Sequence, residues 1–213
     1  MEQMAFDIEI SSITYKFTSM PSGYEMKYLT EIEGDIFAND ADGIEYLAGK
    51  VKYIFINADE AIDDGFSPEE LLDLQSNTAH FMGDIYDKKG YCFRRKILNL
   101  CDHATFSSNL LILDRIELLP AYRGRNWFTE ILDDGIRHFG FRADLIALKA
   151  FPLQFEANSQ SENIIEWRNK MAIKLLSQDE KKSFRRLESY YKKFGFIKVS
   201  NYGVMVRTLG YHF

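Results

Sequence analysis

The chain has 213 residues, of which 46% are apolar and 15% aromatic, and its formal net charge is −6. This length predicts one domain with a sizeable core, and the four prolines, without any low-complexity tract, argue against disorder or a flexible linker. The acidic balance makes nucleic acid a poor partner for the whole surface, although a local basic patch could still bind phosphate. No window approaches the roughly 18 apolar residues needed to cross a bilayer, so we expect neither a nucleic-acid nor a membrane partner.

The cysteines and histidines show no metal-binding pattern. Cys92 and Cys101 lack C-x-x-C spacing, and the four histidines lack an H-E-x-x-H arrangement. The amino terminus carries Glu2 and Asp7 in place of the basic residues that precede the apolar stretch of a signal peptide. We therefore expect two reduced core thiols in a cytoplasmic protein that holds no metal.

Strand patterns fill the first part of the chain. Period-two alternation of β-branched and aromatic residues with polar ones predicts strands over Phe6–Phe17, Tyr24–Ile32 and Tyr46–Ile56. The breaks PSG at 21–23 and NDADG at 39–43 have turn composition. Together these segments predict an antiparallel meander.

A capping pattern marks the first predicted helix. In SPEELLDLQS, Ser67 is the N-cap, Pro68 takes the first helical position and Glu70 the third, which is typical of a capping box. Further on, the segment Tyr91–Leu100 fits either a strand or a helix, and the pattern does not decide between them.

Strands and helices alternate in the second half. Leu110–Leu119 is a nearly continuous apolar run, which fits a central strand covered on both faces. Apolar spacing then predicts a helix over Arg125–Phe139, a strand over Asp144–Phe155, a helix over Asp179–Phe194 and a final strand over Phe196–Leu209.

The turn LPAYRGRNWF, Leu119–Phe128, joins the central strand to a helix. Such a turn exposes unpaired backbone N–H groups where the helix dipole is positive, and Gly124 lets a ligand approach that backbone closely. Arg123 and Arg125 could add charge-assisted hydrogen bonds to phosphate, so the segment predicts a diphosphate site. There is no G-x-G-x-x-G and no P-loop pattern. The alternative is that both arginines are solvated residues on an ordinary turn.

Two segments resemble motifs of the GNAT N-acetyltransferase family. IELLPAYRGRN is similar to the family's pyrophosphate-binding segment, with matches at Pro120, Tyr122, Arg123 and Gly124. YKKFGF, Tyr191–Phe196, is similar to the family's later Y-x-x-x-G-F motif between a helix and a strand. The two segments follow the family's order, so the resemblance covers Leu110 to about Leu209.

The resemblance implies an α/β (α+β) fold with a mixed, mostly antiparallel central sheet flanked by helices. One domain would span 1–213, with N-terminal strands and helices in 1–109 and an acetyl-CoA-binding core in 110–209. The implied activity is the transfer of an acetyl group from acetyl-CoA, as cosubstrate, to a small-molecule or peptide amine that attacks the thioester directly.

The resemblance also implies roles for individual residues. Glu117 would be the base that deprotonates the amine, and Tyr191 the acid that protonates the departing thiolate. Strand N–H groups near Leu118 and Leu119 would polarise the thioester carbonyl. The other cofactor-binding residues would be Tyr122, Arg123, Gly124, Arg125, Asn126 and Trp127, with Asn158 in the place of an asparagine that often touches the pantetheine arm.

Other features leave a second interpretation open. Asn126 stands where the family usually has Gly or Ala, and the stretch before YKKFGF is longer than the family's usual connection. A GNAT-shaped binding or regulatory protein, which holds CoA or has lost it, would also fit. In that case Tyr191 is a core residue and Glu117 only pairs with Arg115.

Acidic residues are dense in the first part of the chain, with ten between Glu31 and Asp64 against Lys50 and Lys52. Such a field would attract a cationic amine, but a solvated surface is the favoured explanation. The sequence does not identify the acceptor, and it leaves both a monomer and a homodimer open.

Overall fold

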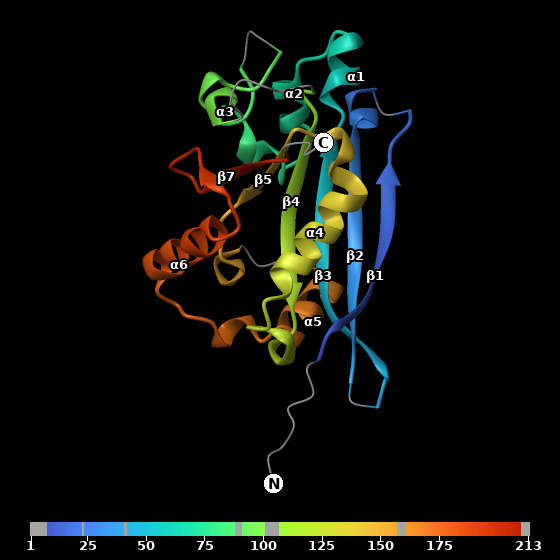
Figure 1. Cartoon of the computed structure of the whole chain (residues 1–213), viewed down its shortest axis with the longest axis vertical. Coiled ribbons are helices and arrows are strands. Elements are labelled where there is room, and N and C mark those ends of the chain that lie inside the picture. Colours follow the sequence, from blue (N-terminus) through green and yellow to red (C-terminus); the bar gives the residue numbers. More distant parts are fainter. Residues whose placement is uncertain are drawn as a thin grey trace.

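The computed structural model of the chain describes residues 8–22, 24–40, 42–87, 91–100, 107–156 and 161–209. These residues form a seven-stranded sheet in the order β1-β2-β3-β4-β5-β7-β6 (Figure 1). Its strands are β1 Ile10–Ser19, β2 Leu29–Asn39, β3 Glu45–Ile56, β4 Leu110–Leu118, β5 Leu145–Lys149, β6 Ile197–Lys198 and β7 Val204–Thr208. Among these strands β4 and β5 pair in parallel, and every other neighbouring pair is antiparallel.

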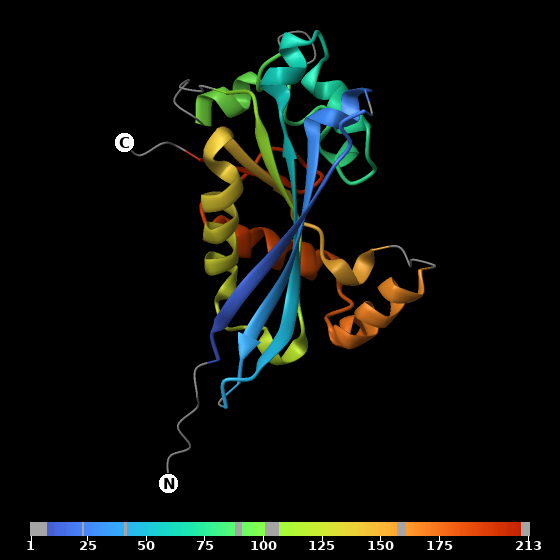
Figure 2. The ribbon, with the colours of Figure 1, turned by 90° about the vertical axis from the view of Figure 1, so that its right-hand side faces the viewer.

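Helices cover both faces of the sheet. Figure 2 shows α4 on one face and α5 on the opposite face, with α1 and α2 at one end of the molecule. The α-helices are α1 Ala58–Asp63, α2 Pro68–Asp73, α3 Arg95–Leu100, α4 Trp127–Phe139, α5 Glu162–Lys170 and α6 Glu180–Lys192. Short 3₁₀ turns are η1 Tyr24–Tyr28, η2 Ala79–Phe81, η3 Pro120–Tyr122, η4 Gly140–Arg142, η5 Leu153–Phe155 and η6 Ile173–Leu175.

A hydrophobic core lies on each face, and β4 contributes to both. Leu110 and Ile112 pack with residues of α1, α2 and α3, whereas Leu111 and Leu113 pack with residues of α4. Successive side chains of a strand point to opposite faces, so a strand covered on both sides needs an apolar residue at each position. The predicted central strand is confirmed.

The packing of α4 on the sheet depends on one glycine. The Tyr53 hydroxyl of β3 donates a hydrogen bond of 2.7 Å to the Ile131 carbonyl. A Cβ added at Gly135 would lie 2.3 Å from that tyrosine ring and hydroxyl, so only glycine allows this approach. The contact fixes the height of α4 above the sheet, and with it the position of the loop before α4.

Much of the predicted element order is confirmed. The first three strands form an antiparallel meander, α2 starts at Pro68 with the capping box of Ser67 and Glu70, and α4 and α6 lie where helices were expected. The coarse fold class is also confirmed, because the chain is a mixed α/β structure with a mostly antiparallel sheet and flanking helices. The open choice at Tyr91–Leu100 resolves into a short helix, α3, preceded by an isolated bridge at Phe93.

Three predicted strands had wrong bounds. Tyr24–Tyr28 is a 3₁₀ turn and not strand, and β2 instead extends to Asn39. The strand predicted over Asp144–Phe155 ends at Lys149, three residues before Pro152, which cannot donate to a ladder. The final strand is a hairpin of β6 and β7, because Gly203 adopts a left-handed φ of 88° and turns the chain.

Two other expectations concern burial and membranes. Cys92 is half-buried and not a core thiol, while Cys101 lies outside the described residues. Within the described ranges, no helix combines the length and apolar character that a membrane span requires.

Candidate functional site

The strands β4 and β5 separate partway along their length. Their parallel pairing runs only from Leu110↔Leu145 to Leu113↔Leu148, while β4 continues to Leu118 with β3 on its other side. The register with β3 shifts between Lys52 and Tyr53, so Asp114 is the extra residue of a bulge at this point. Bulges bend a strand, and the pairing with β5 ends where this bulge begins, so the last part of β4 has one edge without a neighbouring strand.

The open edge of β4 presents backbone groups of Leu118. The N–H of Leu119 donates to the Ala48 carbonyl of β3 at 2.9 Å. Because backbone groups alternate between the two edges of a strand, those of Leu118 point away from β3. The Leu118 carbonyl accepts from Arg123 Nε at 2.8 Å. Of the two N–H groups expected to polarise a thioester, only that of Leu118 therefore faces the open edge.

The loop from β4 to α4 leaves consecutive N–H groups unpaired. Tyr122 and Arg123 donate back within the η3 turn, and Thr129 donates to the Asn126 carbonyl at 3.4 Å. For the N–H groups at positions 124–128, the described part of the chain offers no acceptor. Residues 124–126 are exposed, so this backbone is accessible to a ligand at the N-terminus of α4.

Two left-handed residues give the loop its shape. Gly124 has a φ of 76° and Asn126, the N-cap of α4, a φ of 64°. Glycine adopts this region freely, and asparagine is among the few other residues that tolerate it. A Cβ at Gly124 would meet no atom within 4 Å, so space beside the loop is open. Tyr122 and Trp127 flank the loop and stack at 5.5 Å between ring centroids.

The two arginines of the loop differ in their contacts. Besides its bond to Leu118, Arg123 donates from a terminal nitrogen to the Met171 carbonyl at 2.5 Å, and burial lowers the pKa of its guanidinium. Arg125 is exposed and makes only a long contact of 3.4 Å to the Ala121 carbonyl. Arg123 therefore links β4 to the segment after α5, whereas Arg125 is the freer cation for a phosphate.

Glu117 is buried, and both of its carboxylate oxygens have partners. Oε1 accepts from Arg115 at 3.1 Å and Oε2 from the Trp167 indole at 2.7 Å. Only 7% of the residue is exposed. The alternative pairing with Arg115 is thus present, and α5 supplies a second partner.

Residues of the long connection extend this network, and sequence patterns did not point to them. Glu156 accepts from Arg115 at 3.0 Å through one oxygen and from Arg168 at 3.2 Å through the other. Lys50 lies 4.8 Å from the ring centroid of Trp167. These groups come from three separate segments, so only the folded chain brings them together.

Tyr191 lies on the other side of the sheet from Glu117. It packs in the core on the α4 face, with its ring 5.3 Å from that of Phe128 in the first turn of α4. Its hydroxyl makes no hydrogen bond to the part of the chain that the structure describes. Burial raises its pKa well above the ordinary value, so the hydroxyl keeps its proton and can act as a donor.

A second polar cluster, which no sequence pattern indicates, lies where β4 and β5 separate. Asp114 and Lys149 directly follow the last paired residues of the two strands. Burial raises the pKa of Asp114, and burial followed by the charge of Lys149 lowers the pKa of His80. Three distant segments supply these residues, so no local spacing pattern could have indicated them.

The remaining expectations concern Asn158, metals and the acidic first half. Asn158 lies outside the described residues. In the ranges that the structure covers, no group of three or more His, Cys, Asp or Glu side chains could hold a metal ion. Some of the acidic charge is paired, since Lys52 lies 2.8 Å from Glu31 and Lys27 lies 2.8 Å from Asp64.

Comparisons of the chain with known protein families, with curated proteins and with solved structures gave no match.

Proposed function

We propose that the chain is a GNAT-like N-acetyltransferase that moves an acetyl group from acetyl-CoA to a small-molecule or peptide amine. The observation that carries the proposal is the run of unpaired N–H groups at positions 124–128, beside the open edge of β4. Backbone N–H groups at a helix N-terminus favour a phosphate ligand. The extended pantetheine arm of acetyl-CoA could lie along this open edge, in the position that a neighbouring β-strand would take.

The residues of the loop suit a diphosphate. The positive end of the α4 dipole and the exposed Arg125 would add attraction to the backbone hydrogen bonds. The Asn126 side chain makes no capping bond within α4, so its amide is free to donate to a phosphate oxygen. Leu118 N–H, on the open edge, would donate to the thioester carbonyl.

The chemistry needs three proton transfers. An ammonium has no lone pair, so a base must take a proton before the amine nitrogen attacks the carbonyl carbon. The attacking nitrogen then loses its second proton to water, the carbon–sulfur bond breaks, and the departing thiolate accepts a proton. In this proposal Glu117 accepts the first proton, directly or through water, and Tyr191 protonates the thiolate and is reprotonated from water.

A second candidate function is a CoA-binding protein without catalysis. The pairing of Glu117 with both Arg115 and Trp167 favours it, because these two contacts satisfy one acceptor site on each oxygen and explain a buried carboxylate without a catalytic role. The two candidates share the cofactor loop and differ in turnover.

A thiol-release assay tests the proposal. The full chain is mixed with acetyl-CoA and a panel of amines, and free thiol is measured over time. An amine-dependent rate that exceeds the rate of hydrolysis without amine supports the transferase. Binding of acetyl-CoA without such a rate for any amine supports the non-catalytic candidate.

A further inference from the structure

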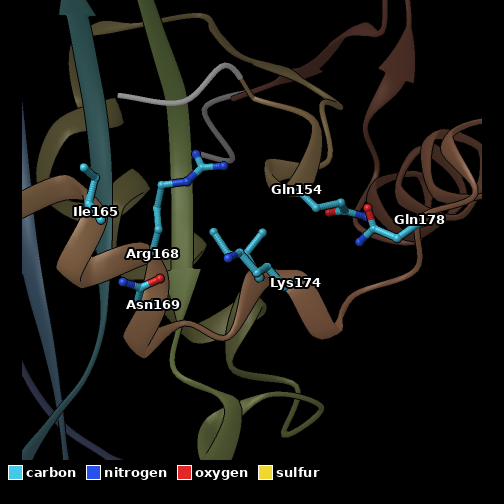
Figure 3. Close-up of a pocket in the computed structure, with 7 residues that line it drawn as sticks. Gln154, Ile165, Arg168, Asn169, Lys174 and Gln178 are labelled. Carbon is cyan, nitrogen blue, oxygen red and sulfur yellow. The ribbon is translucent and has the colours of Figure 1, made fainter. Parts of the chain in front are cut away.

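A cavity of about 400 Å³ lies beside α5, outside the proposed cofactor loop. Its described lining consists of Gln154, Ile165, Arg168, Asn169, Ile173, Lys174 and Gln178. Figure 3 shows α5 with Ile165, Arg168 and Asn169 on one side of the cavity and Gln154 with Gln178 on the other. The volume falls in the range of small-molecule sites.

The lining is cationic. It includes the guanidinium of Arg168 and the ammonium of Lys174, while its described members include no carboxylate. Lys174 is exposed and has no ion-pair or hydrogen-bond partner in the described ranges. A cavity with two cations and no acid favours an anionic ligand.

The nearest carboxylate pairs with Arg168 but not with Lys174. Glu156 contacts Arg168 with one oxygen and Arg115 with the other, and Arg115 also pairs with Glu117 and Asp114. Within the described residues, the unpaired positive charge at the cavity is therefore that of Lys174. Arg168 is also held by the Leu153 carbonyl at 3.4 Å, so its charge is fixed at the cavity wall and keeps N–H groups for a ligand.

The other lining residues indicate which groups the ligand carries besides its anionic group. Gln154 donates to the Ser177 carbonyl at 3.1 Å, and Gln178 donates to the Leu176 carbonyl at 2.8 Å. These bonds orient the two side-chain amides and leave their oxygens as acceptors. Ile165 and Ile173 supply an apolar wall, and Ile165 is 44% exposed, so an aliphatic group that covers it would remove apolar surface from water.

We propose that this cavity binds a small organic anion, with a carboxylate or phosphate between Arg168 and Lys174 and a short aliphatic part against the two isoleucines. The shared chemistry of carboxylate and phosphate is what the two cations recognise, since both groups accept charge-assisted hydrogen bonds. The proposal does not depend on acetyl transfer, because none of its residues belongs to the proposed cofactor loop.

Isothermal titration of the full chain, without acetyl-CoA, tests the proposal with three matched probes. These are 4-methylpentanoate, 3-methylbutyl phosphate and the neutral 4-methylpentanamide. At least one anion should bind at least about tenfold more tightly than the amide, because charge-assisted hydrogen bonds exceed neutral ones by about that factor. The tighter anion identifies the preferred group. Equal affinity for amide and anions, or no binding of either anion at millimolar concentration, would overturn the proposal.

Two charge-removing variants locate the site. Lys174→Gln should weaken anion binding about tenfold, whereas Lys170→Gln should leave it unchanged. Lys170 lies on α5 but outside the lining, and it pairs with Glu166 at 2.8 Å. Equal losses in both variants, or no loss in Lys174→Gln, would contradict the assignment. Both lysines are exposed, so folding should survive either substitution.

Discussion

At the scale of single residues, the proposed cofactor loop depends on backbone conformation more than on side-chain charge. Asn126 takes the position where the GNAT family usually has Gly or Ala, and its φ of 64° is a conformation that asparagine tolerates. The substitution therefore keeps the shape of the loop and adds an amide that could donate to a ligand. Of the two arginines expected to bind phosphate, Arg123 is instead engaged with two carbonyls.

The first prediction concerns the hydroxyl of Tyr191. Tyr191→Phe keeps the ring that packs on Phe128 and removes a hydroxyl that makes no hydrogen bond in the described residues. If this hydroxyl protonates the thiolate, kcat should fall by about 10²-fold while acetyl-CoA affinity and melting temperature change little. Steady-state kinetics measure kcat, and thermal unfolding of the same preparation with and without acetyl-CoA measures the melting temperature and the binding. A kcat within a few-fold of the parent would leave Tyr191 as a core residue only.

The second prediction concerns the pH dependence that Glu156 gives to stability. Burial raises the pKa of this carboxyl, even though Arg115 and Arg168 act to lower it. Because the pKa of Glu156 is higher in the folded state, the native chain binds more protons than the unfolded chain at any pH between the unfolded and the folded pKa. Stability from this group is therefore greatest below the unfolded pKa and is lost as pH rises through the folded pKa.

Urea unfolding from about pH 4 to pH 7 measures this effect against Glu156→Gln. The stability of the parent relative to this variant should decline as pH rises. Glu166→Gln is the matched control on α5, because Lys170 lowers the pKa of Glu166 and the sign is opposite. The contribution of Glu166 is present at neutral pH and lost as pH falls. The same slope for both variants would refute the interpretation of Glu156.

At the scale of elements, the long connection between β5 and α6 is part of the site and not only a spacer. Trp167 of α5 donates to Glu117, and the Met171 carbonyl accepts from Arg123. These two contacts join the connection to the strand and loop that would bind the cofactor. A change in the connection should therefore alter the neighbouring site.

The third prediction separates the two arginines of the loop. Arg123→Ala removes both carbonyl contacts, so it should lower the free energy of unfolding by about 1–3 kcal/mol without any ligand. Arg125→Ala should leave stability within about 0.5 kcal/mol and weaken acetyl-CoA binding by about tenfold, since one phosphate contact is lost. Urea unfolding and calorimetric titration measure the two effects. An unchanged affinity in Arg125→Ala would remove that residue from the site.

Elements with strong periodicity were predictable, and those set by tertiary contacts were not. Helix α4 follows from its apolar spacing, and α2 from Ser67, Pro68 and Glu70. Helix α1, only six residues long, gave no such pattern and was not predicted. The segment after Lys149 was wrongly taken as strand, because its apolar residues continue although its pairing with β7 ends there.

The candidate site was predictable to a similar extent. The loop at 119–127 was found because glycine and arginine at a strand-to-helix turn form a local pattern. Only one of the two partners of Glu117 was expected. Arg115 is two residues away in the sequence, whereas Trp167 is fifty residues away. Contacts across that separation depend on how the chain folds and leave no periodic signal.

At the scale of the whole molecule, the sheet places the proposed site. Strands from both halves of the chain form one sheet, and its single parallel pair in the described residues is the one that separates. The loop that follows β4 begins α4 on one face, while Glu117 and α5 lie on the opposite face. Cofactor and acceptor could therefore reach the open edge of β4 from different sides.

The central claim is that the loop before α4 binds the diphosphate of acetyl-CoA, and substitutions at Gly124 test it. Asp and Asn have the same shape, and both tolerate the left-handed φ of this position better than most residues. They differ in charge, so Gly124→Asp places a carboxylate beside the proposed diphosphate, whereas Gly124→Asn is a neutral control.

The decisive measurement is the melting temperature of the parent and both variants with and without acetyl-CoA in excess. Ligand at about 100 times its Kd stabilises a protein by about 2.7 kcal/mol, which for a chain of this size raises the melting temperature by roughly 5–10 °C. The account predicts this rise in the parent, most of it in Gly124→Asn and almost none in Gly124→Asp. No rise in the parent at millimolar acetyl-CoA, or an equal rise in Gly124→Asp, would contradict it.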